Sequence, residues 1–250
     1  MKAARERLDV LMVRKGLVES RQRAQALILA GEVCVNDQRM LKAGALVPED
    51  AGIRITSHPM PYVGRGGLKL EAALSAFKMD VSGWRCLDVG ASTGGFTDCL
   101  LQHGARHVTA VDVGYGQLHW KLRSDPRVSL IERTNIRHLD PQVLGDAVDL
   151  ACIDVSFISL KIVVPAVLKL VKHPHRIVCL IKPQFEVGKG LVGKGGVVRD
   201  PALHRAVIED ITGSLGTLRL RRQGITPSPI LGPKGNQEYL AHFEASGGNP

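Results

Sequence analysis

The sequence predicts a mostly parallel α/β sheet with helices on both faces, preceded by a small α+β module. Two observations support this prediction. After residue 64, apolar runs of strand length alternate with longer helical patterns, an order typical of a parallel sheet that is covered on both sides. Before residue 58, two short helical patterns are followed by short runs that alternate as strands do. The length of 250 residues permits one large domain or a small domain fused to a medium one.

Seven strands are expected in the larger part. Five of them are strongly apolar, and two near the C-terminus could add a hairpin at the edge of the sheet. The predicted strands cover residues 86–89, 108–112, 128–131, 148–154, 177–181, 217–222 and 238–243. The predicted helices cover residues 68–77, 97–103, 160–171 and 201–215.

The small module is expected to begin with two helices. The first helix carries Leu8 and Leu11 and stops at Gly16, and Ser20 is placed to cap the second, which Gly31 ends. Strands are expected at residues 33–35 and 53–55, with a turn at 36–37.

A proline-rich segment separates the two parts. Pro59 and Pro61 lack backbone donors and bias the residues before them towards extended conformations, so neither a helix nor a central strand continues there. We therefore assign residues 1–58 to the module, 59–63 to a linker, 64–246 to the larger domain and 247–250 to a flexible tail.

The charge balance favours a polyanionic partner. Lys and Arg number 33 against 24 Asp and Glu, which gives a formal net charge of +9. A basic surface that binds nothing specific remains the alternative. Because aromatic residues are only 4% of the chain, phosphate contacts and shape should matter more than base stacking.

Basic residues in the module and near the expected cleft are candidates for RNA contacts. Those on the two helices could share one face, although an ordinary solvated helix surface would look the same. A loop rich in glycine and lysine over residues 186–200 is interpreted either as a flap that closes on phosphates or as a flexible connection. The RNA-binding candidates are Arg7, Arg14, Lys15, Arg21, Arg23, Arg65, Lys189 and Lys194.

Cysteine usage and hydropathy indicate a cytoplasmic protein. The five cysteines form no CxxC pair and have apolar neighbours, so we expect buried thiols, with neither disulfides nor a zinc or other metal site. The first 14 residues carry charges throughout, and the most apolar long stretch, residues 150–171, is interrupted by charges and a proline. Neither secretion nor a membrane partner is expected.

A glycine-rich loop follows the first strand of the sheet and opens a helix. Such a turn lets the backbone approach a ligand closely, and Asp112 ends the next strand, where a carboxylate can accept the hydroxyl protons of an adenosine ribose. A nucleoside cofactor is therefore indicated. The spacing alone also permits NAD. However, Ser92 replaces the middle glycine of the GxGxxG motif, whose role is to let the backbone approach a pyrophosphate. S-adenosylmethionine has no phosphate, so this replacement disfavours S-adenosylmethionine less than NAD. The loop candidates for cofactor binding are Asp88, Gly90, Ala91, Ser92, Thr93, Gly94, Gly95 and Phe96.

Three more polar residues follow expected strands. Asn135 could reach an adenine edge, or it could simply cap a turn, and the sequence does not separate these interpretations. Asp154 and Lys182 each end an apolar strand, at the edge of the sheet that faces the binding crevice. The two charges could serve the site, Asp154 also contacting the cofactor, or form a plain structural salt bridge.

Longer motifs resemble known families. The module, with Arg7-Leu8-Asp9, Ser20-Arg21 and Gly31-x-Val33-x-Val35-Asn36, resembles the S-four RNA-binding domain. The whole chain resembles the TlyA family, also called the hemolysin A family, whose catalytic domain is similar to FtsJ-type RNA 2'-O-ribose methyltransferases. The motifs that carry this resemblance are Arg65-Gly66-Gly67-Leu68-Lys69, residues 88–97, Ile153-Asp154-Val155-Ser156-Phe157, Ile181-Lys182-Pro183-Gln184-Phe185-Glu186 and Gly235-Asn236-Gln237-Glu238.

The resemblance implies a Rossmann-like, S-adenosylmethionine-dependent methyltransferase domain that acts on ribosomal RNA or ribosomal subunits, with cytidine as the nucleoside. It also implies a catalytic tetrad of Lys69, Asp154, Lys182 and Glu238. A ribose 2'-hydroxyl must lose its proton as it attacks the methyl group, and desolvation and a second cation both favour a neutral lysine as base. We expect Lys182 to be the base or oxygen-steering group, held by Asp154, with Lys69 and Glu238 as orienting partners; which lysine is the base stays open.

Other functions are weighed against this one. Methyl transfer to exocyclic amines usually comes with an Asn/Asp-Pro-Pro-aromatic run after the fourth strand, and this chain lacks that run. Methylation of carbon 5 of a pyrimidine needs a cysteine nucleophile, and Cys152 and Cys179 lie inside apolar strands, which disfavours this reaction. An RNA-binding assembly factor without turnover remains an alternative, and a membrane-damaging haemolysin is a weaker one. A monomer and a weak dimer are both compatible with the sequence.

Overall fold

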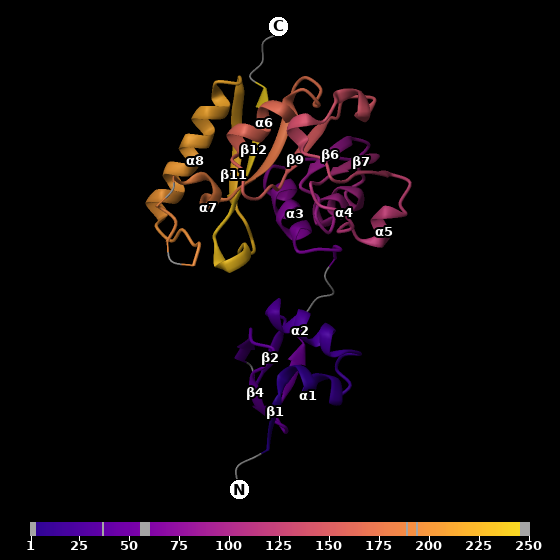
Figure 1. Ribbon diagram of the computed structural model, residues 1–250, viewed down its shortest axis with the longest axis vertical. Helices are drawn as coiled ribbons and strands as arrows, with labels where there is room; N and C mark the ends of the chain where they lie inside the picture. The colour runs from indigo at the N-terminus through magenta and orange to yellow at the C-terminus, as the bar shows by residue number, and fades with distance from the viewer. Residues whose placement is uncertain (1–3, 37, 56–60, 189, 194, 246–250) are drawn as a thin grey trace. The chain divides into compact units, whose positions relative to one another are not determined.

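The computed structural model describes residues 4–36, 38–55, 61–188, 190–193 and 195–245. The chain divides into two compact units, Met1–Pro61 and Tyr62–Pro250 (Figure 1). Tyr62 is buried in the core of the second unit, and the N–H of Val63 donates to Asp98 Oδ2 at 2.8 Å. Residues 62 and 63, which we assigned to the linker, therefore pack with the second unit. The tail at 247–250 lies outside the described residues.

The first unit packs two helices against short strands. Its helices are α1 (Leu8–Arg14) and α2 (Arg21–Leu29), and its strands are β1 (Arg5–Arg7), β2 (Val33–Val35), β3 (Gln38–Met40), β4 (Leu46–Pro48) and β5 (Ile53–Ile55). Strands β3, β2 and β5 form one sheet, and β1 pairs with β4. The predicted cap is confirmed, because Ser20 Oγ accepts a hydrogen bond from the N–H of Arg23 at 3.2 Å. Strands β1, β3 and β4 were not predicted, since three residues are too few to show a period.

A buried carboxylate ties the two helices of this unit together. Asp9 is fully buried on α1, and it accepts hydrogen bonds from Arg7, from Arg21 Nε at 2.9 Å and from Gln25 Nε2 at 2.8 Å. The hydrogen bond from Arg7, together with those from Gln25 and Arg21, holds the pKa of Asp9 well below its usual range, although burial opposes this. The ionised carboxylate is thus part of the core of the unit.

The second unit is built on a seven-stranded sheet in the order β11-β12-β10-β9-β6-β7-β8. Its strands are β6 (Arg85–Val89), β7 (His107–Val111), β8 (Val128–Ile131), β9 (Leu150–Ile153), β10 (Arg176–Ile181), β11 (Leu220–Pro227) and β12 (Tyr239–Ala245). The first five are mutually parallel, and β12 runs antiparallel to both β10 and β11. The predicted α/β fold is confirmed, and β11 lies at the edge of the sheet.

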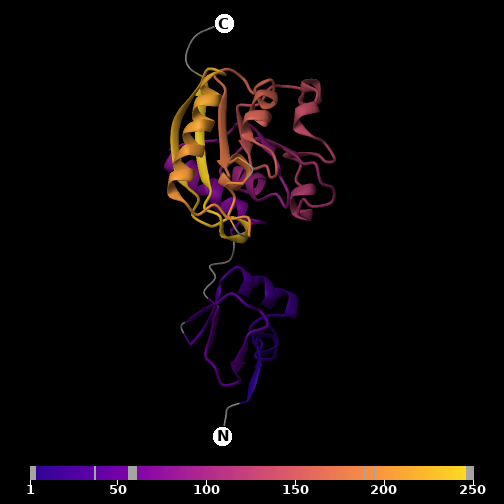
Figure 2. The same cartoon turned by 60° about the vertical axis from the view of Figure 1, so that its left-hand side comes forward.

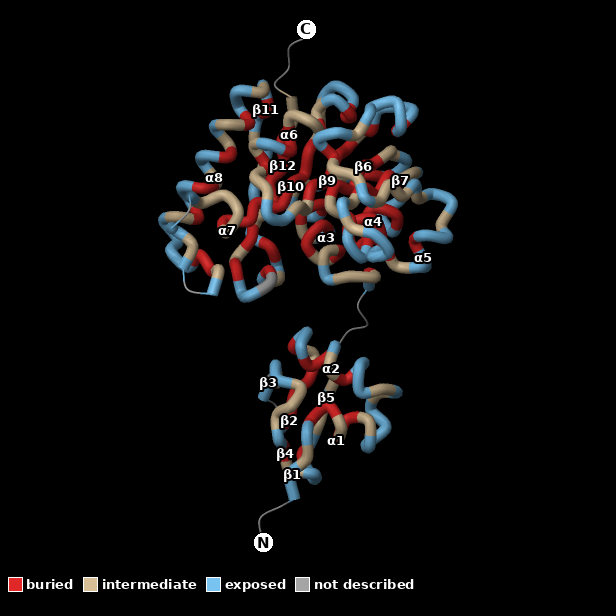
Figure 3. The backbone as a smooth tube through the Cα atoms, in the orientation of Figure 1, coloured by how far each residue is buried: buried red, intermediate tan, exposed pale blue. Residues whose placement is uncertain are grey.

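Helices cover both faces of this sheet (Figures 1 and 2). They are α3 (Gly66–Ala76), α4 (Gly95–Gln102), α5 (Trp120–Arg123), α6 (Leu160–Leu168), α7 (Pro183–Glu186) and α8 (Pro201–Gly216), with 3-10 turns at Ile136–His138, Pro141–Leu144 and Pro233–Gly235. One hydrophobic core contains side chains of α3, α4 and α5, and the other contains side chains of α6 and α8. The strands between them are buried, as Figure 3 shows for β9, β10 and β6.

Two predicted elements are shorter than expected. Residues 148–154 were predicted as one strand, but β9 covers Leu150–Ile153. The helix predicted over 160–171 ends at Leu168. Beyond it, the carbonyl oxygen of Leu170 accepts from the N–H of Val148 and the N–H of Lys172 donates to the carbonyl oxygen of Val148, so Val171 forms a bridge with Val148. The apolar pattern continues past the helix because these residues remain in the core.

Four of the cysteines lie in the two hydrophobic cores of the second unit. Burial raises the pKa of the Cys86 and Cys99 thiols to about 12, and it also raises the pKa of the Cys152 and Cys179 thiols.

In the described ranges, no helix is both long and apolar enough to span a membrane.

Replacing Asp9 with Asn should destabilise the first unit by about 2 kcal/mol, because two guanidinium groups lose their shared anion. Because the pKa of Asp9 is lowered in the folded protein, its ionised carboxylate stabilises the fold at pH values above the ordinary carboxyl pKa of about 3.9. This stabilisation is lost as the pH falls below that value. Hydrogen exchange of α1 and α2 amides in the full chain, corrected for intrinsic rates, should therefore show a loss of protection below about pH 4 that Asp9→Asn flattens. The exposed Asp50→Asn variant is the control, and equal behaviour of the two variants would contradict this role.

Candidate active site

The loop between β6 and α4 passes close to the end of β9. Gly90 has a φ of 87°, and a Cβ atom at this position would overlap the carbonyl oxygen of Asp154. Because β9 and β6 are neighbours in the sheet, the loop and Asp154 meet at the carboxyl ends of two adjacent strands. Glycine at position 90 therefore allows both the left-handed turn and the close backbone approach.

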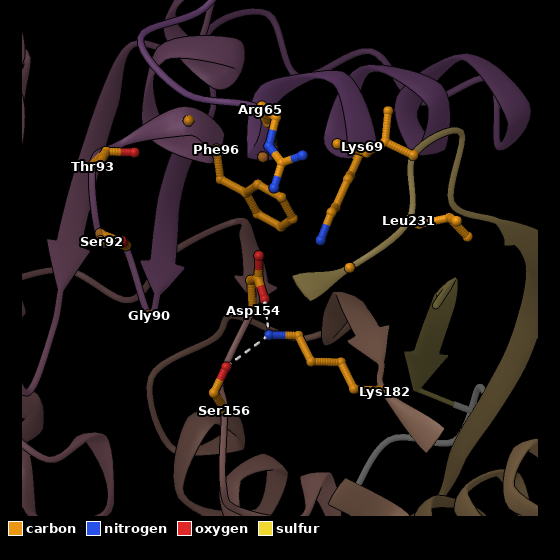
Figure 4. A pocket seen from close by; sticks show the side chains of 15 residues that line it. Arg65, Lys69, Gly90, Ser92, Thr93, Phe96, Asp154, Ser156, Lys182 and Leu231 are labelled. Atoms are coloured by element: carbon orange, nitrogen blue, oxygen red, sulfur yellow. Dashed lines mark hydrogen bonds and ion pairs between the residues drawn. The ribbon is translucent and has the colours of Figure 1, made fainter. Parts of the chain in front are cut away.

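A pocket of about 270 Å³ opens at this edge of the sheet (Figure 4). Its walls are the glycine-rich loop, the start of α3 and the segment 230–232. Lys69, Asp154 and Lys182 line it together with the exposed side chain of Arg65. A concave site with converging charged groups at strand ends is where ligands bind in open α/β sheets.

Lys182 is held by two oxygen atoms at the floor of the pocket. Its Nζ lies 2.6 Å from Asp154 Oδ1 and donates a hydrogen bond to Ser156 Oγ at 3.0 Å (Figure 4). The Lys182 side chain is 9% exposed and that of Asp154 20% exposed. An ammonium has three N–H bonds, so the Nζ retains a donor beyond these two contacts.

Lys69 and Glu238 form a second buried ion pair. Lys69 Nζ donates to Glu238 Oε2 at 2.6 Å, with side chains that are 9% and 0% exposed. Gln184 Nε2 donates to the other oxygen of Glu238 at 3.3 Å. Gly232 packs so tightly against Glu238 that a Cβ atom there would overlap the carboxylate.

The four predicted catalytic residues thus come together as two lysine–carboxylate pairs. Lys69, Asp154 and Lys182 line one pocket, and Glu238 lies directly behind Lys69. We expected Asp154 to hold Lys182 and Lys69 to act on Lys182 as a neighbouring cation. The structure pairs Lys182 with Asp154, and it also gives Lys69 a carboxylate partner, Glu238, in the same region. The arrangement can hold a polar group between two ammonium groups, with a carboxylate near the glycine-rich loop.

Most predicted cofactor residues line the pocket: these are Gly90, Ala91, Ser92, Thr93, Gly95, Phe96 and Asp154. Asp88 has a different position, since its buried Oδ2 accepts hydrogen bonds from the N–H and the hydroxyl of Thr97 at 2.9 and 2.6 Å. Burial raises the pKa of Asp88 to about 7 despite these bonds. Gly94 packs beside Leu118 and Leu122, where a Cβ atom would not fit. Asp88 and Gly94 therefore support the glycine-rich loop from the protein interior and do not line the pocket.

Asp112 and Asn135 are engaged with the main chain. Asp112 accepts hydrogen bonds from the N–H of Ser92 at 2.7 Å and from the N–H of Gly114 at 2.6 Å, so it braces the glycine-rich loop. Asn135 Oδ1 accepts from the N–H of Arg137 at 3.1 Å and caps a 3-10 turn. The capping interpretation therefore describes the Asn135 side chain.

The basic residues of the first unit are largely paired. Arg7 and Arg21 bind Asp9, and Arg14 lies 2.7 Å from Glu6 and 3.2 Å from Glu49. Lys15 Nζ donates to the carbonyl oxygen of Ala51 at 2.8 Å, and Arg23 is exposed on α2. Of the candidates in the second unit, Arg65 lines the pocket, and Lys189 and Lys194 lie outside the described residues.

Sequence reasoning missed several polar residues around the site. Ser156 binds Lys182, and Gln184 binds Glu238. Asn236, which is 2% exposed, accepts from the N–H of Val198 at 3.0 Å and donates to the carbonyl oxygen of Gly196 at 2.9 Å. The signal that could have found them is their place in the family motifs, because each of these residues lies within two positions of a predicted catalytic residue.

Comparison with known proteins defines the class. A family model described as FtsJ-like methyltransferase matches residues 62–245, and an S4 domain model matches residues 6–53. The chain is therefore a methyltransferase of the FtsJ-like family that also carries an S4 domain.

Individual relatives narrow this assignment. The chain is 48% identical over 239 residues to the Mycobacterium tuberculosis protein named 16S/23S rRNA (cytidine-2'-O)-methyltransferase TlyA, covering 95% of this chain and 89% of that protein. It is 42% identical over 238 residues to Hemolysin A of Brachyspira hyodysenteriae, covering 95% and 99%. A solved Streptococcus thermophilus protein designated a hemolysin superposes with a TM-score of 0.77 at 42% identity, covering 97% of this chain and 89% of that one. The chain belongs to the TlyA family, and the resemblance seen in its motifs is confirmed.

The Lys69–Glu238 pair allows a stability test. Glu238→Ala should lower the free energy of unfolding by about 3 kcal/mol, because it leaves a buried ammonium without its anion, whereas the double variant Lys69→Met with Glu238→Leu should recover most of this loss. Urea denaturation measures both. Asp210→Ala, which breaks the more exposed pair with Lys161, is the control and should cost less than about 1 kcal/mol. A Glu238→Ala variant as stable as this control would show that the buried pair contributes nothing.

Proposed function

We propose that this methyltransferase transfers a methyl group from S-adenosylmethionine to the 2'-hydroxyl of a cytidine ribose in ribosomal RNA. The observation that carries the proposal is the Lys182–Asp154 pair, which lies in the same pocket as the glycine-rich loop and a second lysine. The names of relatives such as the Mycobacterium tuberculosis protein support ribosomal RNA as substrate and cytidine as the nucleoside.

The residues around the pocket fit an adenosyl group. Glycine at position 90 keeps the loop free of a side chain beside Asp154, and the main chain from Gly90 to Thr93 lines the pocket. Asp112, fixed at the end of β7, has lone pairs beyond its two main-chain bonds and would accept from a ribose hydroxyl. Asp154 would lie beside the positively charged sulfur.

S-adenosylmethionine supplies an electrophilic methyl group when it is bound. Lys182 reaches the pocket from the end of β10, fixed in direction by Asp154 and Ser156, and would contact the attacking 2'-oxygen. We propose Lys182 as the base, which takes the hydroxyl proton once its amine is neutral. Lys69, fixed by Glu238, would orient the same ribose from the opposite wall.

The substrate RNA is proposed to use basic groups of both units. An S4 domain covers residues 6–53, and its exposed Arg23 remains a candidate contact together with the paired Arg7, Arg14 and Arg21. Arg65 lines the active pocket, so it would meet a phosphate next to the target nucleotide. The protein is proposed to act in the cytoplasm, where ribosomal RNA is available in a reducing environment that suits its buried thiols.

The central test is transfer of labelled methyl from S-adenosylmethionine to ribosomal RNA, offered as naked RNA and as separate subunits. Lys182→Ala should lower kcat by about a thousandfold or more, and Lys182→Arg should also be inactive, because a guanidinium stays protonated at neutral pH. Lys172→Ala, which removes an exposed lysine paired with Asp149, should leave kcat unchanged. Mass spectrometry of the digested RNA should find the label on a cytidine ribose.

Two results would reject parts of this proposal. No incorporation by the wild-type protein into any of the substrates would reject the enzymatic function and favour binding without turnover. Full activity of Lys182→Arg would reject Lys182 as the base, since that variant keeps only the hydrogen-bond donors.

Gly90→Ala tests the cofactor site separately. The added Cβ would overlap the carbonyl oxygen of Asp154 at a φ of 87°, so we expect the Kd for S-adenosylmethionine, measured by calorimetry, to rise by about tenfold or more. Gly83→Ala is the matched control, because Gly83 has a φ of 73° while a Cβ there would meet no atom of the described chain within 4 Å. Equal affinity of the two variants would place the cofactor elsewhere.

A further inference from the structure

Two segments that carry the active residues are joined side by side. One runs from Asp154 at the end of β9 to Leu160 at the start of α6, and the other is Lys182 followed by α7. At their first end, Lys182 contacts Asp154 and Ser156. This contact belongs to the active pocket, and the two segments also meet at two further places.

The second contact joins two aromatic rings. The ring centroids of Phe157 and Phe185 lie 4.9 Å apart at an interplanar angle of 50°. Phe157 is 89% exposed and has a φ of 64°, a left-handed conformation that is costly for a residue with a bulky side chain. Surrounding contacts must hold this conformation, and a ring contact at the surface is a weak restraint by itself.

The third contact is made by the carboxylate of Glu186, the last residue of α7. Its Oε2 accepts a hydrogen bond from Ser159 Oγ at 2.6 Å, and its Oε1 accepts from the N–H of Leu160 at 2.9 Å. Leu160 is the first residue of α6, where a free N–H and the helix dipole both favour an anion. Glu186 therefore fixes the far end of the segment that begins with Asp154.

We propose that Glu186 is a positioning residue for methyl transfer: by fixing α7 to the start of α6, it sets the geometry in which Lys182 meets Asp154 and Ser156. This inference rests on the proposed function of Lys182. Glu186 does not line the pocket as described, so it would act through the two segments and not by contact with substrate.

The energetics of Glu186 separate this role from a purely structural one. Burial raises the pKa of the Glu186 carboxyl, with Asp210 acting in the same direction and the two hydrogen bonds and Lys161 opposing it. A raised pKa means that the folded protein binds this proton more tightly than the unfolded chain, so ionisation of Glu186 lowers stability as the pH rises. At neutral pH the ionised form of Glu186 is therefore less favourable to stability than the protonated form would be.

The test compares Glu186→Gln and Glu186→Ala with the control Glu209→Gln, which changes an exposed carboxylate of α8 paired with Arg222. A glutamine cannot accept both hydrogen bonds with its two end groups, so kcat should fall by about fivefold in Glu186→Gln and by about tenfold or more in Glu186→Ala. KM for S-adenosylmethionine and for RNA should change by less than about twofold. The urea midpoint of Glu186→Gln at neutral pH should stay close to that of the wild type, because the loss of one hydrogen bond is offset by removal of a charge that burial disfavours.

A second measurement does not depend on methyl transfer. The side-chain ¹⁵N signal of Lys182, assigned by its loss in Lys182→Arg, should shift in Glu186→Gln and stay in place in Glu209→Gln. An unshifted signal, unchanged kcat, or a kcat loss that is matched by loss of stability would overturn the positioning role. An inactive wild-type protein whose Lys182 signal still responds to Glu186→Gln would instead reject the proposed function and leave the coupling intact.

Discussion

The active pocket depends on opposite charges that are buried at the ends of neighbouring strands. Asp154, Lys182 and Glu238 lie far apart in the sequence, but they adjoin β9, β10 and β12, which are consecutive in the sheet. Removing two charges from water is expensive, and the expense is offset only when the geometry of the pair is good. The sheet supplies that geometry through its strand order, and α3 adds Lys69 from above the same edge.

The sheet and the membership of the site could be predicted because both follow from simple patterns. Apolar runs bounded by a charged residue mark strands that end at the crevice, and this is how Asp154 and Lys182 were found. Residues 69 and 238 came from family motifs and not from periodicity. Of the two ion pairs, the sequence predicted that of Lys182 with Asp154 but not that of Lys69 with Glu238, because the second depends on how far each side chain reaches.

Hydrogen bonds from side chains to the main chain account for most of the remaining differences. Asp112 and Asn135 follow strands at positions that suggest ligand contacts, and the sequence did not show that their oxygens also bind backbone N–H groups of nearby loops. The number of basic residues in the first unit likewise does not reveal which of them are paired. It could not show that one buried aspartate, Asp9, would bind both Arg7 and Arg21. The side chains of Arg7 and Arg21 are 46% and 55% exposed, so Asp9 offsets part of their charge while both remain at the surface.

The attachment of Val198 has a consequence for how this family can change. The N–H of Val198 donates to Asn236, and its carbonyl oxygen accepts from His204 Nε2 at 2.9 Å. These bonds fix the C-terminal end of the segment between Val187 and Val198 next to β12, the strand that follows Glu238. Insertions or deletions between Val187 and Val198 would change the length of the segment without displacing the two lysine–carboxylate pairs of the pocket. The length of the segment between Val187 and Val198 can therefore vary, in evolution or by engineering, independently of the residues that line the pocket.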